Sequence, residues 1–350
     1  MASTTSTWLR SVQSVDATPA YDPGSAMAMS ITSLDPGVER LLRAEEPVIR
    51  YRALTELGGA PADDPASVEA RQHIAAGPIV RRLLDGLGAH GPGAPHPYSK
   101  WRGDHWRLIS LMDLGVPHDL PGMRAAMEPI LGWLLGQAHR SNIPTIDGLP
   151  RRCASQEGNA LAVAVHLGLA SDERIALLAN SLTGWQWPDG GWNCDRRPDA
   201  RHSSFHETLP AFRGLAAYVR ATRDPATAAA ADRAAEFFLR HRVMFRERTG
   251  ERLSLAATQI HYPPYWHYDF YAGLRVLVAS GDVADPRAAE ALDHLEAKRR
   301  DDGMWASDAV HFRAPGSAGS NVEVVDWGRR QPSEPVTLGA LLILRTAGRL

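Results

Sequence analysis

The chain is poor in cysteine and lysine and carries almost no net charge. Two cysteines in 350 residues, Cys153 and Cys194, exclude a disulfide scaffold and favour a reducing, cytoplasmic compartment. The 38 basic side chains nearly balance the 40 acidic ones, and the formal net charge of −2 argues against a nucleic-acid-binding protein. Only Lys100 and Lys298 are lysines, so guanidinium groups, which pair well with carboxylates and phosphates, provide nearly all the positive charge.

Long apolar runs are also missing. No segment approaches the ~18 apolar residues that a membrane span needs, so we expect no transmembrane segment. Residues 1–33 are rich in Ser, Thr and Ala but lack a basic region followed by an apolar one, so they do not read as a signal peptide. We therefore predict a disordered tail over residues 1–33 and a single folded domain over residues 34–350.

A repeat of about 55 residues organises that domain. Apolar helical segments end at positions 58, 115, 168, 224, 281 and 348, and a more polar segment precedes each of them. The polar segments are expected at 67–87, 121–137, 172–182, 225–242 and 286–299, and the first pair begins at Asp35-Pro36. No segment shows the alternation of a strand. We predict an all-α protein of six helical hairpins that close into an (α/α)6 toroid with the apolar helices inside.

One turn of this repeat has a characteristic sequence. Residues 186–192 read Gln-Trp-Pro-Asp-Gly-Gly-Trp, and a shorter copy, Asp-Gly-Met-Trp, occupies 302–305. This resembles the QW repeat of squalene–hopene cyclases and related terpenoid cyclases, and protein prenyltransferase β subunits are built on a similar toroid. As a repeat pattern, the resemblance covers about residues 35–350. It implies an enzyme that acts on an isoprenoid-like or other small apolar substrate in a central cavity, and it makes the repeated turn structural.

The chemistry of that family does not transfer directly. The chain has neither the Asp-x-Asp-Asp motif that protonates alkenes nor an Asp-Asp-x-x-Asp motif that binds magnesium and diphosphate. Two alternatives therefore stay open: a zinc-dependent enzyme of another reaction class on the same toroid, or a non-catalytic toroid that binds a peptide or glycan.

The chemically reactive side chains gather in the long loops before the apolar helices. Cys194, His206 and His267 have the donor types of a zinc site, with Asp195 or Asp269 as a possible fourth ligand. Without a metal, Asp195, His206 and Asp269 are the candidates for acid/base catalysis. In the competing structural interpretation, Ser204 and Glu207 form a capping box at the start of a helix.

A second group of side chains is predicted to contact the substrate. The run Tyr-Pro-Pro-Tyr-Trp at 262–266 could wall a pocket or equally pack as a hydrophobic staple. Cys153 is interpreted as a buried or ligand cysteine rather than a nucleophile, because no partner base is evident. His166, in an apolar helix, is interpreted as a core residue. The predicted substrate-binding residues are Trp101, Arg102, Arg152, Tyr265 and Trp266.

Overall fold

A computed structural model describes residues 35–89, 93–141 and 143–350. The tail predicted at 1–33 lies outside these residues. The described chain is mostly helical, with fourteen α-helices and one two-stranded sheet, β1 (Thr145–Ile146) and β2 (Leu149–Pro150). The all-α prediction is therefore confirmed for the part of the chain that is described. Within it, no helix is both long and apolar enough to cross a membrane.

The helices follow one another in chain order with few other regular elements. The first half contains α2 (Pro36–Leu42), α3 (Pro47–Arg52), η1 (Ala53–Leu57), α4 (Pro65–Gln72), η2 (Ile74–Ala76), α5 (Pro78–Leu84), α6 (Asp104–Leu114), α7 (Met123–Leu135), α8 (Gln137–Arg140) and α9 (Ala154–His166). The second half contains α10 (Glu173–Trp185), α11 (Phe205–Thr222), α12 (Pro225–Arg240), η3 (Ala256–Thr258), α13 (Phe270–Ser280), η4 (Pro286–Ala288), α14 (Ala289–Ala297) and α15 (Glu334–Thr346).

Aspartate–proline pairs begin helices as the sequence predicts. The carboxylates of Asp35, Asp224 and Asp285 each accept a hydrogen bond from an amide of the following turn at 2.7–2.8 Å. Gly115 and Gly281 end α6 and α13 with φ of 78° and 90°, the left-handed conformation that glycine adopts without steric cost. The single helix expected at 67–87 is instead α4, η2 and α5, because a proline at position 78 begins a new helix there.

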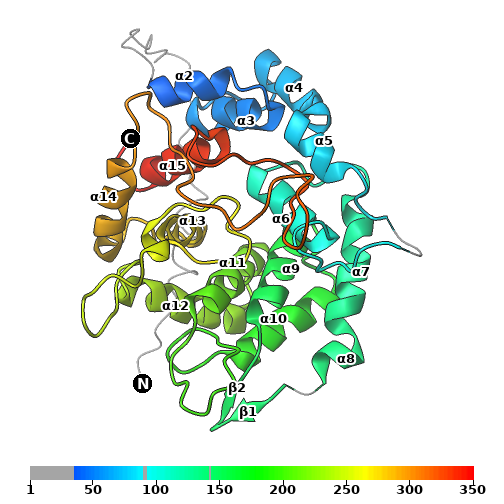
Figure 1. The fold of residues 1–350 in the computed structure, drawn as a ribbon, viewed down its shortest axis with the longest axis vertical. Helices are drawn as coiled ribbons and strands as arrows, with labels where there is room; N and C mark the ends of the chain where they lie inside the picture. The colour runs from blue at the N-terminus through cyan, green and yellow to red at the C-terminus, as the bar shows by residue number, and fades with distance from the viewer. Residues whose placement is uncertain (1–34, 90–92, 142) are drawn as a thin grey trace.

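The centre of the molecule is a close contact between α9 and α11. A Cβ atom added to Gly158 would lie 2.4 Å from the amide nitrogen of Ala211, and one added to Gly214 would lie 2.4 Å from the carbonyl oxygen of Gly158. Only glycine allows backbones to approach so closely. α9 also packs on α6, and α11 packs on α12 and α13. Figure 1 shows α15 returning to lie beside α3, and the two helices are in contact.

Two tryptophans hold consecutive helices together in the same way. The indole N–H of Trp192 donates to the carbonyl of Leu182 in α10 at 2.9 Å, and its backbone N–H donates to Thr208 of α11 at 3.1 Å. Trp305 repeats both bonds, at 2.8 Å and 3.0 Å, to α14 and α15. Both side chains are buried. Each tryptophan therefore ties the end of one helix to the start of the next.

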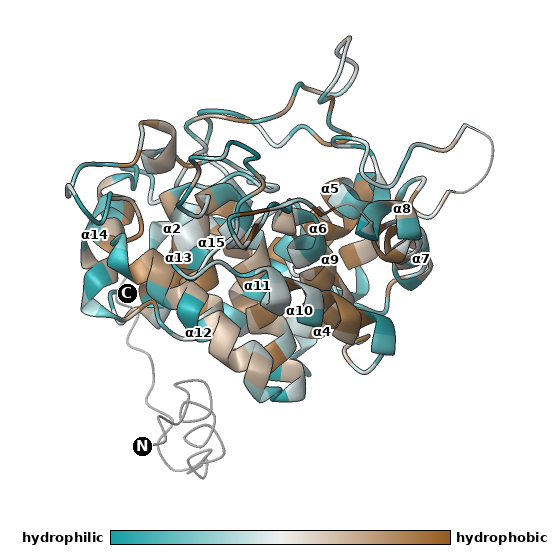
Figure 2. Cartoon of the chain, turned by 90° about the horizontal axis from the view of Figure 1, so that it is seen from below, coloured by the Kyte–Doolittle hydropathy of each residue, from teal (hydrophilic) through white to brown (hydrophobic). Residues whose placement is uncertain are grey.

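The long connections that precede α6, α9, α11, α13 and α15 contact one another. We call this part of the molecule the loop side. Figure 2 shows most of the irregular chain gathered on one side of the helices. Trp101 donates its backbone N–H to the carbonyl of Val322 at 3.4 Å, and Arg152 donates to the carbonyl of Asn193 at 3.2 Å. The segments that carry the predicted site residues therefore meet in space.

Candidate functional site

Two cysteines and a glutamate converge on the loop side. Cys153 lies directly before α9, Cys194 lies in the connection between α10 and α11, and Glu207 lies in the first turn of α11. One donor atom from each of the three lies within 4.8 Å of the other two, and no other set of three His, Cys, Asp or Glu donors in the described residues meets this test. The thiol of Cys194 donates to Oε1 of Glu207 at 3.4 Å.

Glu207 is held by the neighbouring helix. Its Oε2 accepts a hydrogen bond from the backbone N–H of Ser155, in the first turn of α9, at 2.9 Å. Glu207 is buried, and this burial raises the pKa of its carboxyl group. The capping box predicted with Ser204 is wrong: Ser204 makes no side-chain cap, and its amide donates to the carbonyl of Trp192. The carboxylate of Glu207 therefore accepts its hydrogen bond from an amide of α9 and not from the amide of Ser204.

The two thiols are in different electrostatic situations. The contact between the two thiols lowers the pKa of Cys153, and Arg152 acts in the same direction. The same thiol pair, together with burial, raises the pKa of Cys194. Both cysteines are free and partly buried. Cys153 is thus the thiol that ionises first, at the start of a helix whose dipole also favours an anion.

This donor set fits a zinc ion. Thiolate and carboxylate are zinc ligands, and three protein ligands with one open position are typical of catalytic zinc sites. Carboxylate ligands in such sites are themselves held by hydrogen bonds, as Ser155 holds Glu207 here. The predicted set of Cys194, His206 and His267 does not form a group of this kind in the described residues. Of that set, Cys194 alone belongs to the group that does form.

The two histidines lie beside each other, next to an aromatic wall. The rings of His206 and His267 are 6.0 Å apart between centroids, and Trp266 stacks on His267 at 3.9 Å. His267 also stacks on His311 at 3.5 Å, and His311 stacks on His261 at 4.4 Å. Burial and the neighbouring imidazoles lower the pKa of His267 to about 2 and that of His311 to about 3. His267 and His311 are therefore uncharged at neutral pH.

One contact fixes the tautomer of His206. The backbone N–H of Tyr268 donates to Nδ1 of His206 at 2.8 Å. Nδ1 is therefore an acceptor, and the proton of the neutral ring lies on Nε2. Desolvation lowers the pKa of His206, which keeps this neutral form at pH 7. His206 was predicted as a catalytic acid or base, and its geometry provides a hydrogen-bond donor at the exposed edge of the loop side.

The two predicted catalytic aspartates have other contacts. Asp269 is buried: Oδ1 accepts from the amide of Ala272 at 2.8 Å, and Oδ2 accepts from the amide of His261 at 2.8 Å and from its Nδ1 at 3.1 Å. Asp269 is therefore the N-cap of α13 and orients His261. Asp195 forms an ion pair with Arg197 at 2.8 Å, and this partner lowers the pKa of Asp195.

The predicted substrate-binding residues fall into three groups. Trp101 and Tyr265 are buried and stack on each other with centroids 3.8 Å apart, and the hydroxyl of Tyr265 donates to Glu323. Trp266 is only half-buried, so part of its ring is accessible, and the ammonium group of Lys100 lies 4.9 Å from the ring centroid.

Neither arginine in the predicted set contacts the cysteine–glutamate group through its side chain. Arg152 forms an ion pair with Glu157 at 2.6 Å, and the side chain of Arg102 is exposed.

The sequence alone identified only part of the cysteine–glutamate group. Cys153 was interpreted as a buried or ligand cysteine, but Glu207 was assigned to a helix cap. The signal in the sequence was that each cysteine precedes an apolar helix, α9 or α11, in two consecutive repeats. No protein-family model, curated protein or solved structure matches this chain.

Proposed function

We propose that the protein is a zinc-dependent enzyme built on an (α/α)6 toroid, with the metal held by Cys153, Cys194 and Glu207. The observation that carries this proposal is the convergence of three zinc-type donors, from two loops and one helix, at 4.8 Å or less. Zinc held by these residues would supply Lewis-acid activation of a substrate group.

The order of helix contacts supports the toroid. Along the chain, α6 contacts α9, α9 contacts α11, α11 contacts α13, and α13 contacts α15. α15 then contacts α3 and η1, so the last helix pair meets the first. Arg345 donates to the carbonyl of Leu57 at 2.9 Å, and Arg299 pairs with Asp35 across the same junction. A ring of six hairpins predicts these neighbours, whereas an open solenoid leaves its two ends apart.

The chain's own residues prepare the site around the metal. Ser155 orients Glu207, and Arg152 is anchored by Glu157 and by the carbonyl of His139 at 2.9 Å, which positions the segment before Cys153. His206 presents its Nε2 proton to a substrate oxygen or leaving group, since its Nδ1 is occupied by the amide of Tyr268. These residues bind and orient substrate and can provide one hydrogen-bond donor.

Side chains of the loop side favour a small substrate with an apolar part. Trp266 presents a half-buried aromatic ring there, and the uncharged ring of His267 packs between Trp266 and His311. The second candidate reaction is therefore a terpenoid cyclase-like or prenyltransferase-like one on an isoprenoid-like substrate, favoured by the aromatic wall and by the resemblance of the 186–192 turn. The missing acidic motif places the metal-dependent reaction first.

Metal analysis tests the proposal directly. Purified full-length protein is expected to contain about one zinc per chain, and Cys153→Ser, Cys194→Ser and Glu207→Gln are expected to lose it. Asp195→Asn is the matched control, because Asp195 adjoins Cys194 but pairs with Arg197 at the surface. Retention of zinc by the cysteine variants, or its absence from the folded wild-type protein after zinc has been supplied, would refute the metal site.

His206→Ala then separates metal binding from chemistry. This variant is expected to keep its zinc and its fold, because the side chain is exposed and is not among the three donors. Turnover of a substrate found by screening small apolar compounds is expected to fall roughly 100-fold, the usual loss for a proton-donating side chain. Unchanged turnover would remove His206 from the reaction.

A further inference from the structure

A cavity of about 260 Å³ lies between α6, α9, α11 and α13, and its lining does not include the cysteine–glutamate group. We call it the arginine cavity. Most of its wall is apolar, including Met112, Leu209 and Val276. Its volume is just below the usual range of pockets for drug-sized ligands, so it suits a small molecule.

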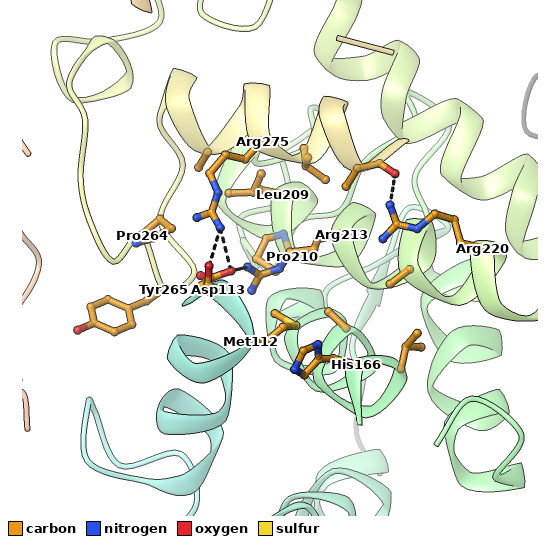
Figure 3. A pocket seen from close by; sticks show the side chains of 16 residues that line it. Met112, Asp113, His166, Leu209, Pro210, Arg213, Arg220, Pro264, Tyr265 and Arg275 are labelled. Atoms are coloured by element: carbon orange, nitrogen blue, oxygen red, sulfur yellow. Dashed lines mark hydrogen bonds and ion pairs between the residues drawn. The ribbon is translucent and has the colours of Figure 1, made fainter. Parts of the chain in front are cut away.

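Three arginines project into this apolar space. Arg213 and Arg220 are seven residues apart on α11, which places them on one face of that helix, and Arg275 comes from α13. Figure 3 shows Arg213 and Arg275 directed toward Asp113 at the end of α6, with Arg220 farther along the cavity. Asp113 is the one carboxylate among the described residues that line it. The wall therefore carries two more positive than negative charges.

The partners of these groups are incomplete. Asp113 forms ion pairs with Arg213 at 2.9 Å and with Arg275 at 3.4 Å. Its side chain is only 5% exposed, and its second oxygen, Oδ2, is buried without a hydrogen bond, as is Nε of Arg213. Buried polar atoms without partners are rare in folded proteins, so these two mark a charged cluster whose hydrogen bonds are not all satisfied.

The surroundings leave part of the positive charge uncompensated. Among the described residues, the guanidinium group of Arg220 bonds only to the carbonyl of Ala279, and Arg220 is the exposed member of the three. His166 also lines the cavity, but its Nε2 donates to the carbonyl of Val116 at 2.8 Å, and burial lowers its pKa, so it adds no charge. Burial, and secondly the neighbouring Arg275, lower the pKa of Arg213, as expected where cations crowd together.

We propose that the arginine cavity binds a small organic anion, with its carboxylate or phosphate group against Arg213, Arg220 and Arg275 and a short apolar body against the remaining wall. Guanidinium groups bind both anions through paired N–H donors, and partial burial strengthens these bonds.

This site goes beyond the proposed zinc chemistry and does not depend on it. Tyr265 and Pro264 close the cavity toward the loop side, and Figure 3 shows the ring of Tyr265 pointing away from the arginines. The hydroxyl of Tyr265 is taken by Glu323. Loss of zinc and loss of anion binding are therefore separable results.

Calorimetric titration of the full-length protein tests the proposal with three probes of matched size: butyrate, butyl phosphate and the uncharged butyramide. At least one anion is expected to bind, with an affinity that falls as salt is raised, and butyramide is expected to bind much more weakly. The stronger of the two anions identifies the head group. Equal binding of butyramide, or no binding of either anion at millimolar concentration, would overturn the proposal.

Two variants are expected to change anion affinity in opposite directions, which a structural role alone would not produce, and a third is the control. Arg220→Met, whose side chain is exposed and makes one bond to a backbone carbonyl, is expected to fold normally and to weaken anion binding roughly tenfold. Asp113→Asn removes the competing carboxylate and is expected to tighten anion binding several-fold. Arg252→Met, at an exposed position that does not line the cavity, is the matched control. Anion binding that is unchanged in both Arg220→Met and Asp113→Asn would overturn the assignment.

Discussion

The loop side and the arginine cavity use opposite chemistry within one small protein. On the loop side, sulfur, carboxylate and uncharged imidazole groups meet where several long connections touch. In the arginine cavity, guanidinium groups extend from the middle of regular helices into an apolar space. The loop side thus supplies metal ligands for a cation, and the helices of the arginine cavity supply hydrogen-bond donors for an anion. Tyr265, whose φ is 53°, lies between the two regions and is held by Trp101 and Glu323.

Removal of a cysteine is expected to have the largest effect and to act only on the loop side. Cys153→Ser or Cys194→Ser should weaken zinc binding by more than about 100-fold, since loss of a ligand exceeds the 10–100-fold cost of losing a supporting hydrogen bond. Competition with a chelator of known affinity measures this change. Binding of butyrate or butyl phosphate should stay as in the wild type. A parallel loss of anion binding would show that the two regions are one site.

Truncation of a repeated tryptophan is expected to lower the stability of the whole fold, which contains both regions. Trp192→Ala and Trp305→Ala should each lower the free energy of unfolding by roughly 3–5 kcal/mol, because each removes a buried indole with two hydrogen-bond functions at a helix junction. Chemical denaturation measures the loss, with the exposed Leu177→Ala as a control for surface truncation. An unchanged unfolding free energy, with activity lost, would make these tryptophans functional instead.

A smaller substitution tests Tyr265, which lies between the two regions. Tyr265→Phe removes the hydroxyl that donates to Glu323, a buried carboxylate whose other oxygen accepts from the amide of Val324 at 2.6 Å. Leaving an oxygen of Glu323 without its donor should cost roughly 1–3 kcal/mol of stability. Zinc content and anion affinity should both be retained. If either changes strongly, Tyr265 belongs to that site and does more than separate the two.

A further expected effect lies outside both regions and appears only as a change with pH. Burial raises the pKa of Glu46 from 4.5 to about 7. The folded state therefore binds a proton at Glu46 more tightly than the unfolded chain, so this residue's contribution to stability is full below pH 4.5 and is lost as pH rises to about 7.

Glu46→Gln should remove that dependence. Relative to the wild type, it should gain roughly 1–3 kcal/mol of unfolding free energy between pH 4.5 and pH 8. Any constant cost of the amide cancels in this difference. Denaturation curves at the two pH values measure it, and an identical pH dependence in both proteins would contradict the raised pKa.

Local signals in the sequence predicted the helices well and the site only in part. Asp35, Asp224 and Gly115 act through contacts within a few residues, so their caps could be read directly. Glu207 shows the limit: its own helix offered a local cap, but an amide of α9, 52 residues earlier in the chain, binds its carboxylate.

The sequence also carries a signal for the arginine cavity. Arg213, Arg220 and Arg275 are charges within otherwise apolar helices, an unfavourable placement unless they serve a ligand or a partner. These three side chains line the same cavity only because of the way α11 and α13 pack against each other, and that packing cannot be read from a single sequence. The same holds for His206, whose tautomer is set by an amide 62 residues later in the chain.

X-ray absorption spectroscopy at the zinc edge of the purified full-length protein tests the central claim most directly, because it counts the sulfur ligands. Coordination by Cys153, Cys194 and Glu207 predicts two sulfur atoms at about 2.3 Å, with the remaining ligands oxygen or nitrogen at about 2.0–2.2 Å. A spectrum with one sulfur and the outer-shell scattering of two imidazoles would contradict the account and would favour Cys194, His206 and His267 as the ligands.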